Sequence, residues 1–115
     1  MNVKHFLSRH VAVNGLVHKL SIVSLKDGAL TGVKPFSEET QSVIYVPGVL
    51  IVVPDAHATA FESKLACFMH GDEQTLIENM RKWMNSSKNI HVGEGEAVSL
   101  YEIDCSRGEW HKIIM

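Results

Sequence analysis

Alternating apolar and polar positions dominate the first third of the chain and predict antiparallel strands joined by tight turns. Asn14-Gly15 separates two β-prone runs, and this dipeptide favours the type I′ turn of a β-hairpin. Every second residue of Leu16–Ile22 falls on one side of a strand, which predicts a mostly buried face. Asp27-Gly28 predicts a second turn, and Ala29–Val33 a third strand that stops at Pro35, because proline lacks an N–H group.

The middle of the chain carries two β-branched runs, Ser42–Val46 and Val49–Val53, separated by Pro47-Gly48. Proline followed by glycine predicts a turn, since proline fixes φ and glycine tolerates positive φ. Both runs are apolar at successive positions, which is typical of strands buried on both faces. We therefore expect either core strands or a subunit interface here.

Between Asp55 and Lys88 the hydrophobic period changes from two to about 3.6 and predicts helices. The first helix is amphipathic and ends at Gly71; its apolar face consists of Phe61, Leu65, Phe68 and Met69. The second helix spans Glu73–Asn85 and is capped by Asp72. Its apolar stripe consists of Leu76, Ile77, Met80, Trp83 and Met84.

The chain then returns to β structure. Ala97–Asp104 predict a strand, Ser106-Arg107-Gly108 a turn, and Glu109–Ile114 a last strand. Strands at both ends with one or two helices between them predict an α+β fold that is mainly β. We expect a small β-sandwich or partly open barrel that forms one domain over residues 1–115.

Composition and charge narrow the partners. Eleven Lys and Arg against thirteen Asp and Glu give a net charge of −2 and no basic run, which argues against nucleic acid. The longest apolar stretch, Val46–Pro54, is far shorter than the roughly 20 residues of a membrane span. The first residues lack the apolar core of a signal peptide, so we expect a cytoplasmic protein in which Cys67 and Cys105 are reduced thiols.

Three segments together resemble a known arrangement: Lys26–Val33, Tyr45–Gly48 and Ile90–Tyr101. They are similar to the strands that flank the catalytic barrel in the amidohydrolase superfamily and form its composite β-sandwich domain. The resemblance covers roughly half of the chain and implies that the N-terminal and C-terminal strands close one β-domain. The barrel is absent, because a (β/α)8 barrel needs at least ~200 residues.

The chemistry of that family is not implied for this chain. Counting from Pro47-Gly48, the positions where the family places Asp, His and His are Ile51, Val53 and Asp55. A displaced motif over Asp55–Thr59 lacks the second histidine. The resemblance therefore implies the frame of a hydrolase without its metal ligands.

Another metal site is an open alternative, because the chain has seven histidines. Cys67 and His70 share one face of the first predicted helix, and His57 is a further candidate ligand for a transition metal such as zinc. The competing interpretation is a buried structural cysteine with surface histidines, since no second ligand pair follows. We expect no resident cofactor.

Nucleophilic catalysis has less support. A catalytic pair of Cys105 and His111 is supported only by the proximity of the two residues in a predicted hairpin. Gly93-x-Gly95 lacks the third glycine of a dinucleotide loop, which favours a turn. The carboxylates show no acid/base spacing, so we lean against an enzyme.

The sequence assigns no specific biochemical function. The favoured hypothesis is a non-enzymatic domain that acts through self-association or through another protein. The reason is that Val43–Val53, Trp83 and Trp110 carry more apolar surface than a small domain easily buries. A small metal-binding protein, or the remnant of a metal-dependent hydrolase, is the alternative. A further alternative is a small-ligand site between the sheet and the Glu73–Asn85 helix.

Overall fold

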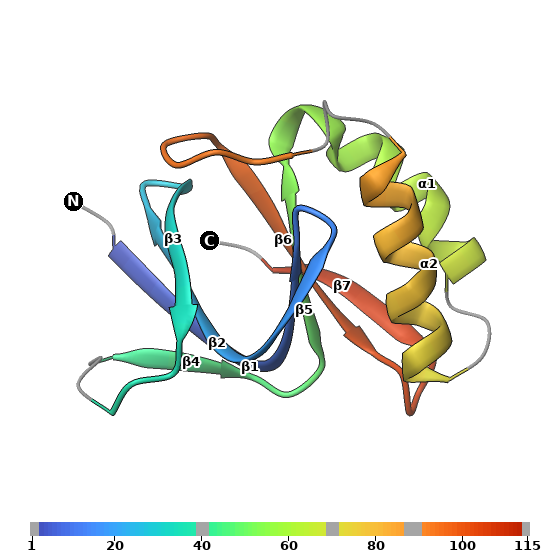
Figure 1. The fold of residues 1–115 in the computed structure, drawn as a ribbon, viewed down its shortest axis with the longest axis horizontal. Coiled ribbons are helices and arrows are strands. Elements are labelled where there is room, and N and C mark those ends of the chain that lie inside the picture. The colour runs from blue at the N-terminus through green and yellow to red at the C-terminus, as the bar shows by residue number, and fades with distance from the viewer. Residues whose placement is uncertain (1–2, 39–41, 69–71, 87–90, 114–115) are drawn as a thin grey trace.

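The computed structural model describes residues 3–38, 42–68, 72–86 and 91–113. Its elements in chain order are β1 (Val3–Val13), β2 (Leu16–Lys26), β3 (Ala29–Pro35), β4 (Val43–Val46), β5 (Val49–Pro54), the short 3-10 helix η1 (Asp55–His57), α1 (Ala58–Phe68), α2 (Glu73–Asn85), β6 (Val98–Asp104) and β7 (Glu109–Ile113). The predicted α+β class, mainly β, is confirmed (Figure 1).

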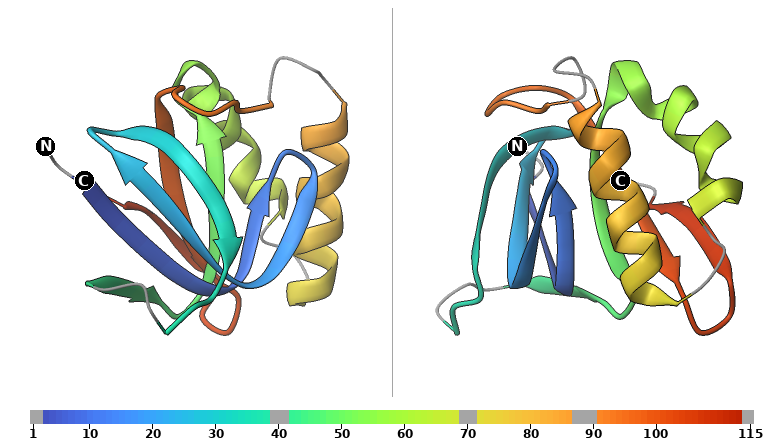
Figure 2. Two further views of the ribbon diagram at one scale, coloured as in Figure 1. Left: turned by 60° about the vertical axis from the view of Figure 1, so that its left-hand side comes forward. Right: turned by 45° about the vertical axis from the view of Figure 1, so that its right-hand side comes forward.

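The strands form one curved sheet in the order β3-β2-β1-β5-β6-β7, with β4 also paired to β1. Successive hairpins are antiparallel, whereas β1 runs parallel to β4 and β5. The curvature brings the start of β3 to the chain that leads into β6, where Ala29 and Ala97 form an isolated bridge. The N-terminal and C-terminal strands therefore lie in one sheet, with β5 between β1 and β6 (Figures 1 and 2).

The turn expected at Pro47-Gly48 is wrong, because β4 and β5 both run parallel to β1 and the chain does not reverse. Ser8 pairs with Val46 and Val11 with Leu50. Two residues of β1 thus stand opposite three of the other strand, which is a β-bulge. The buried Ser8 hydroxyl occupies the gap: it lies 2.8 Å from the Gly48 carbonyl oxygen, to which it donates, and accepts from the His10 N–H at 3.3 Å.

The expectation that both middle runs are buried holds for β5 and fails for β4. Every residue of β5 is buried, because β5 lies between β1 and β6 and is covered on both faces. In β4, Ile44 is 47% exposed and Tyr45 is 54% exposed. The cause is the bulge, since β6 pairs with β5 and β7 but not with β4, and no described strand lies along the far edge of β4.

The buried face predicted for the start of β2 is also wrong. Leu16 and Leu20 are both about half exposed, whereas all five residues from Ser21 to Leu25 are buried. Leu20 adopts a positive φ of 43°, which interrupts the alternation of the strand. A period-two pattern cannot show such a local change of backbone conformation.

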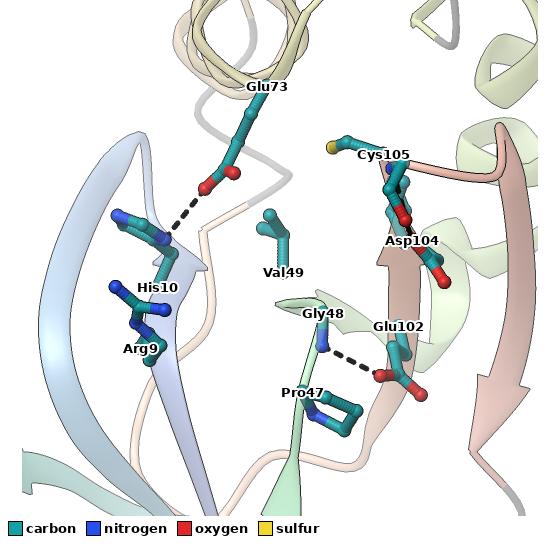
Figure 3. A pocket seen from close by; sticks show the side chains of 11 residues that line it. Arg9, His10, Pro47, Gly48, Val49, Glu73, Glu102, Asp104 and Cys105 are labelled. Atoms are coloured by element: carbon teal, nitrogen blue, oxygen red, sulfur yellow. Dashed lines mark hydrogen bonds and ion pairs between the residues drawn. The ribbon is translucent and has the colours of Figure 1, made fainter.

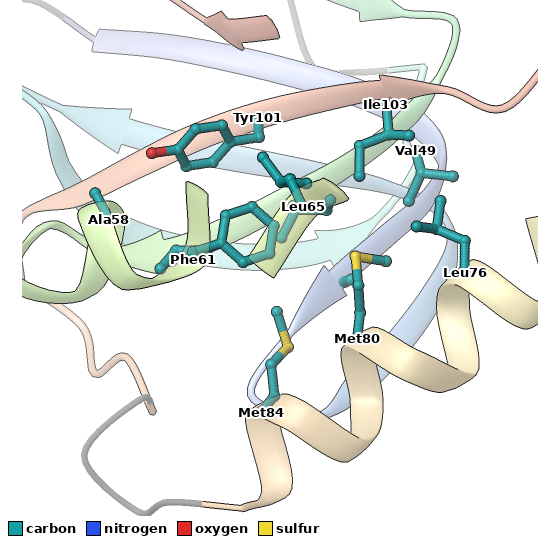
Figure 4. Packing of buried hydrophobic residues seen from close by; sticks show 12 residues of the cluster. Val49, Ala58, Phe61, Leu65, Leu76, Met80, Met84, Tyr101 and Ile103 are labelled. Carbon is teal, nitrogen blue, oxygen red and sulfur yellow. The ribbon is translucent and has the colours of Figure 1, made fainter. Parts of the chain in front are cut away.

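The two helices cover one face of the sheet (Figures 1 and 4). The predicted bounds of α2 are confirmed, and the Asp72 carboxylate caps it by accepting the Thr75 N–H at 2.8 Å. Leu76, Met80 and Met84 are buried against the sheet. The predicted end of the first helix at Gly71 lies outside the described residues.

Two core clusters fill opposite faces of the central strands. The helix side includes Val49, Phe61, Leu65, Met80, Tyr101 and Ile103 (Figure 4). The concave side of the curved sheet includes Phe6, Val23, Leu50, Val52 and Leu100. In the described part of the chain, neither helix is long and apolar enough to cross a membrane.

The predicted hairpin at Asn14-Gly15 is confirmed, with positive φ at both residues. The Asn14 side chain accepts the Val92 N–H at 2.6 Å and donates to the Val92 carbonyl at 3.0 Å. Arg81 of α2 donates to the Gly15 carbonyl at 3.3 Å. The hairpin tip therefore joins the first strands to α2 and to the segment that leads into β6.

Candidate functional site

The metal candidates from the sequence are only partly placed. His57 ends η1, Cys67 lies in α1, and the Cys67 side chain and His70 fall outside the described residues. Within the described ranges, no three His, Cys, Asp or Glu side chains gather as a metal site. The site built from these three residues stays a prediction.

Ile51, Val53 and Asp55, the positions that the sequence comparison set against metal ligands, serve the core and the backbone. Ile51 and Val53 are fully buried on the helix side of the sheet. Asp55 accepts a hydrogen bond from the Ser99 hydroxyl. This carboxylate holds the end of β5 to the start of β6.

A cleft of about 380 Å³ lies between the sheet and the beginning of α2 (Figure 3). Its walls come from β1, the Pro47-Gly48 bulge, the end of β6 and the turn that follows β6. Its polar lining residues are Arg9, His10, Glu73, Glu102, Asp104, Cys105 and Ser106. The cleft lies where the small-ligand alternative expects a site, between the sheet and this helix.

One wall of the cleft carries the basic groups. The His10 Nδ1 lies 2.8 Å from the Glu73 Oε1, which joins β1 to the first residue of α2. Arg9 is exposed beside His10, and its side chain has no hydrogen bond or ion pair with any described residue (Figure 3). Arg9 is therefore the cleft's available cation.

The opposite wall is organised by Glu102, whose side chain is only 14% exposed. Its Oε2 accepts the Gly48 N–H at 2.8 Å, and its Oε1 lies 3.2 Å from the His111 Nε2. Glu102 thus holds the bulge to β6. The sequence missed it, since the bulge that it binds was itself predicted to be a turn.

The hairpin does not bring Cys105 and His111 together as a catalytic pair. Its register places His111 opposite Glu102. Burial raises the pKa of the Cys105 thiol, and the nearby carboxylates of Glu73 and Asp104 add to the rise. Because the thiolate is the nucleophile, this rise in pKa disfavours Cys105 as a nucleophile.

Tyr101 is the other perturbed group on the helix side of the sheet. Its hydroxyl donates to the Glu62 Oε2 at 2.8 Å, and its ring lies 4.9 Å from that of Phe61. Burial and the Glu62 carboxylate raise the pKa of Tyr101 well above its usual range. Tyr101 is thereby a poor proton donor in catalysis and serves packing.

A second candidate surface is the edge of β4. This strand pairs with β1 along one side, and no described strand pairs with its other side. Ile44 and Tyr45 of this strand, which lies at the lower edge of Figure 1, are about half exposed. An unpaired apolar edge strand is a template for another strand.

The fold and these two surfaces define a class of protein: a small, mainly β, α+β domain with a polar cleft and an open strand edge. Comparisons of the chain with known protein families, with curated proteins and with solved structures found no match. The functional argument therefore rests on the two surfaces themselves.

Proposed function

We propose that this protein is a non-enzymatic domain that acts by associating with a second copy of itself. The carrying observation is the exposure of Ile44 and Tyr45 on an unpaired strand. Single exposed apolar residues are ordinary, but here the side chains accompany unpaired backbone groups. Association removes both from water.

The chemistry of the described side chains favours binding over catalysis. The raised pKa of Cys105 disfavours the thiolate, and Tyr101 is held by Glu62. His111 is occupied by Glu102 and His10 by Glu73. These groups stabilise contacts between elements, which suits a binding domain.

Sedimentation equilibrium tests self-association directly. Between about 1 µM and about 1 mM, we expect the average mass to rise from that of a monomer towards that of a dimer, which spans the range of weak complexes. The rise should persist at about 1 M salt, because apolar and backbone contacts are screened little. A monomer at every concentration would contradict the proposal.

A second candidate function is the binding of a small polar ligand, and the cleft favours it. The unpartnered Arg9 lies in the same cleft as the carboxylates of Glu73 and Asp104. A cleft of about 380 Å³ with both signs of charge suits a small molecule that carries an anionic and a cationic group.

Free L-amino acids are suitable probes for this second function. Titration followed by amide NMR should shift the Gly48 and Val49 signals, which line the cleft. Arg9→Ala should abolish the shifts, and Lys34→Ala, an exposed change on β3, should preserve them. Unchanged spectra for amino acids of every charge class would exclude this ligand class.

The resemblance to a composite domain stays a prediction. The N-terminal and C-terminal strands share one sheet, but Val98–Tyr101 form their ladders with β5 and β7 and not with the strands of Arg9–Val33. A barrel-less domain of that kind would use its exposed edges for contacts, which is compatible with self-association.

A further inference from the structure

Among the described strands, β3, β4 and β7 each have a side that pairs with no other strand, and two of these three edges are protected against another strand. The outer side of β7 belongs to a strand that carries Glu109, His111 and Lys112. The outer side of β3 is bridged to Ala97 at its beginning and ends in Lys34-Pro35. Charges, proline and covering segments are the means by which edge strands avoid pairing.

The described residues give the edge of β4 none of these protections. Val43–Val46 contains no charged residue and no proline, and Pro47 comes only after the strand. The Pro47-Gly48 bulge separates β4 from the part of the sheet that β6 covers, so no described strand pairs with its outer backbone groups. Among the three edges, β4 is the one built to accept a strand.

We propose that two copies of this chain pair β4 with β4 in antiparallel orientation about a two-fold axis. This inference rests on the proposed self-association and names its interface. A two-fold axis requires a patch that complements itself, and an antiparallel strand of uniform apolar character does so. The contact would join the two sheets into one continuous sheet across the dimer.

Charge complementarity supports the antiparallel direction. Ser8 pairs with Val46, so the unpartnered Arg9 lies level with the end of β4. Glu38 is exposed in the segment before β4. Antiparallel pairing brings the beginning of one β4 to the end of the other, so the segment that carries Glu38 in one copy approaches the end of β4 that is level with Arg9 in the other.

The other charged groups near that end are already engaged. Glu102 binds the Gly48 N–H and His111, and Asp104 binds the N–H of Ser106 and lies 3.8 Å from Arg107. Arg9 is therefore the charge left for a partner. Because β4 has only four residues, the interface is small and we expect a dissociation constant in the range of about 1 µM to about 1 mM.

Site-specific cross-linking tests the interface. In an antiparallel ladder about a two-fold axis one residue lies opposite its own copy, and a ladder centred on Val43–Val46 puts Ile44 or Tyr45 in that place. Ile44→Cys and Tyr45→Cys, each in a Cys67→Ala, Cys105→Ser background, should be treated with a short thiol cross-linker. We expect one of them to give a covalent dimer in high yield, since directly opposed Cβ atoms lie about 5 Å apart.

Thr31→Cys on β3 and Lys112→Cys on β7 are the matched controls on the other two edges. A dimer by sedimentation that cross-links through β3 or β7, or that leaves positions 44 and 45 uncross-linked, would overturn the β4 interface while self-association stands. A monomer by sedimentation would overturn both.

Charge reversal tests the direction of the strands. Arg9→Glu should weaken the dimer by roughly 2- to 10-fold, which is the range expected for two exposed ion pairs. Adding Glu38→Arg in the same chain should restore the affinity, because each pair is then reversed. Failure of the second change to restore what the first removes would contradict the antiparallel arrangement.

Discussion

Replacing Gly48 with alanine tests the bulge that separates β4 from β5. A Cβ atom at this position would lie 2.5 Å from the Ile103 carbonyl oxygen and 2.9 Å from the Glu102 Cγ. The first of these is backbone of the central strand β6 and cannot move aside without disturbing the sheet. Glycine is needed here for space, because the two strands approach closely.

Overpacking of this kind costs about 1 to 3 kcal/mol in the free energy of unfolding. At a typical urea dependence of about 1 to 3 kcal/mol per molar, the unfolding midpoint of Gly48→Ala should fall by roughly 1 M. Loss of the Gly48 hydrogen bond to Glu102 would add to the loss. Urea unfolding followed by circular dichroism measures the change.

Gly32→Ala is the matched control, because a Cβ at this position in β3 meets nothing within 4 Å. Its free energy of unfolding should stay within about 0.5 kcal/mol of the wild-type value. Equal stability of Gly48→Ala and the wild type would refute the close approach of the bulge to β6, and with it the reason that β4 lies apart from β6.

Three further predictions concern other contacts. Asn14→Gly keeps the turn conformation but removes both hydrogen bonds to Val92, so the free energy of unfolding measured by urea titration should fall by about 1 to 3 kcal/mol. Asn14→Ala should lower the free energy of unfolding further, because alanine tolerates the positive φ of 54° at this position poorly. Because the pKa of Tyr101 is raised, the folded state keeps the Tyr101 proton to higher pH than the unfolded state does. The stability that this protonated hydroxyl contributes is therefore complete below about pH 10 and is lost as the pH rises further. Tyr101→Phe should reduce this alkaline loss of stability in urea titrations, and an unchanged pH profile would contradict the prediction. Elemental analysis of protein purified without a His tag tests the metal prediction: we expect no stoichiometric transition metal, and a metal lost from His57→Ala would restore the metal-binding alternative.

The sequence predicts the elements well where one local signal determines each. Asp72 and the apolar stripe after it specify α2 without reference to the rest of the chain. Asn14-Gly15 specifies its turn because few residues tolerate positive φ. The continuous apolar run Val49–Val53 indicates burial on both faces, which the structure has.

The sequence does not predict what depends on contacts between distant segments. Pro47-Gly48 has the composition of a turn, but the pairing of both flanking strands with β1 makes it a bulge. The exposure of Ile44 follows from where β6 ends, which no residue near Ile44 encodes. The cleft has the same origin, since Arg9, Glu73 and Glu102 come from three separate elements.

Hydrogen exchange of the β4 amides at two protein concentrations tests the central claim most directly. The amides of Val43–Val46 that point away from β1 pair with no described strand in the single chain. If two copies pair through β4, these amides should become protected as the concentration rises, whereas the outer amides of β3 and β7 keep their rates. Exchange rates in β4 that do not change with concentration, in a sample shown to dimerise, would contradict the account.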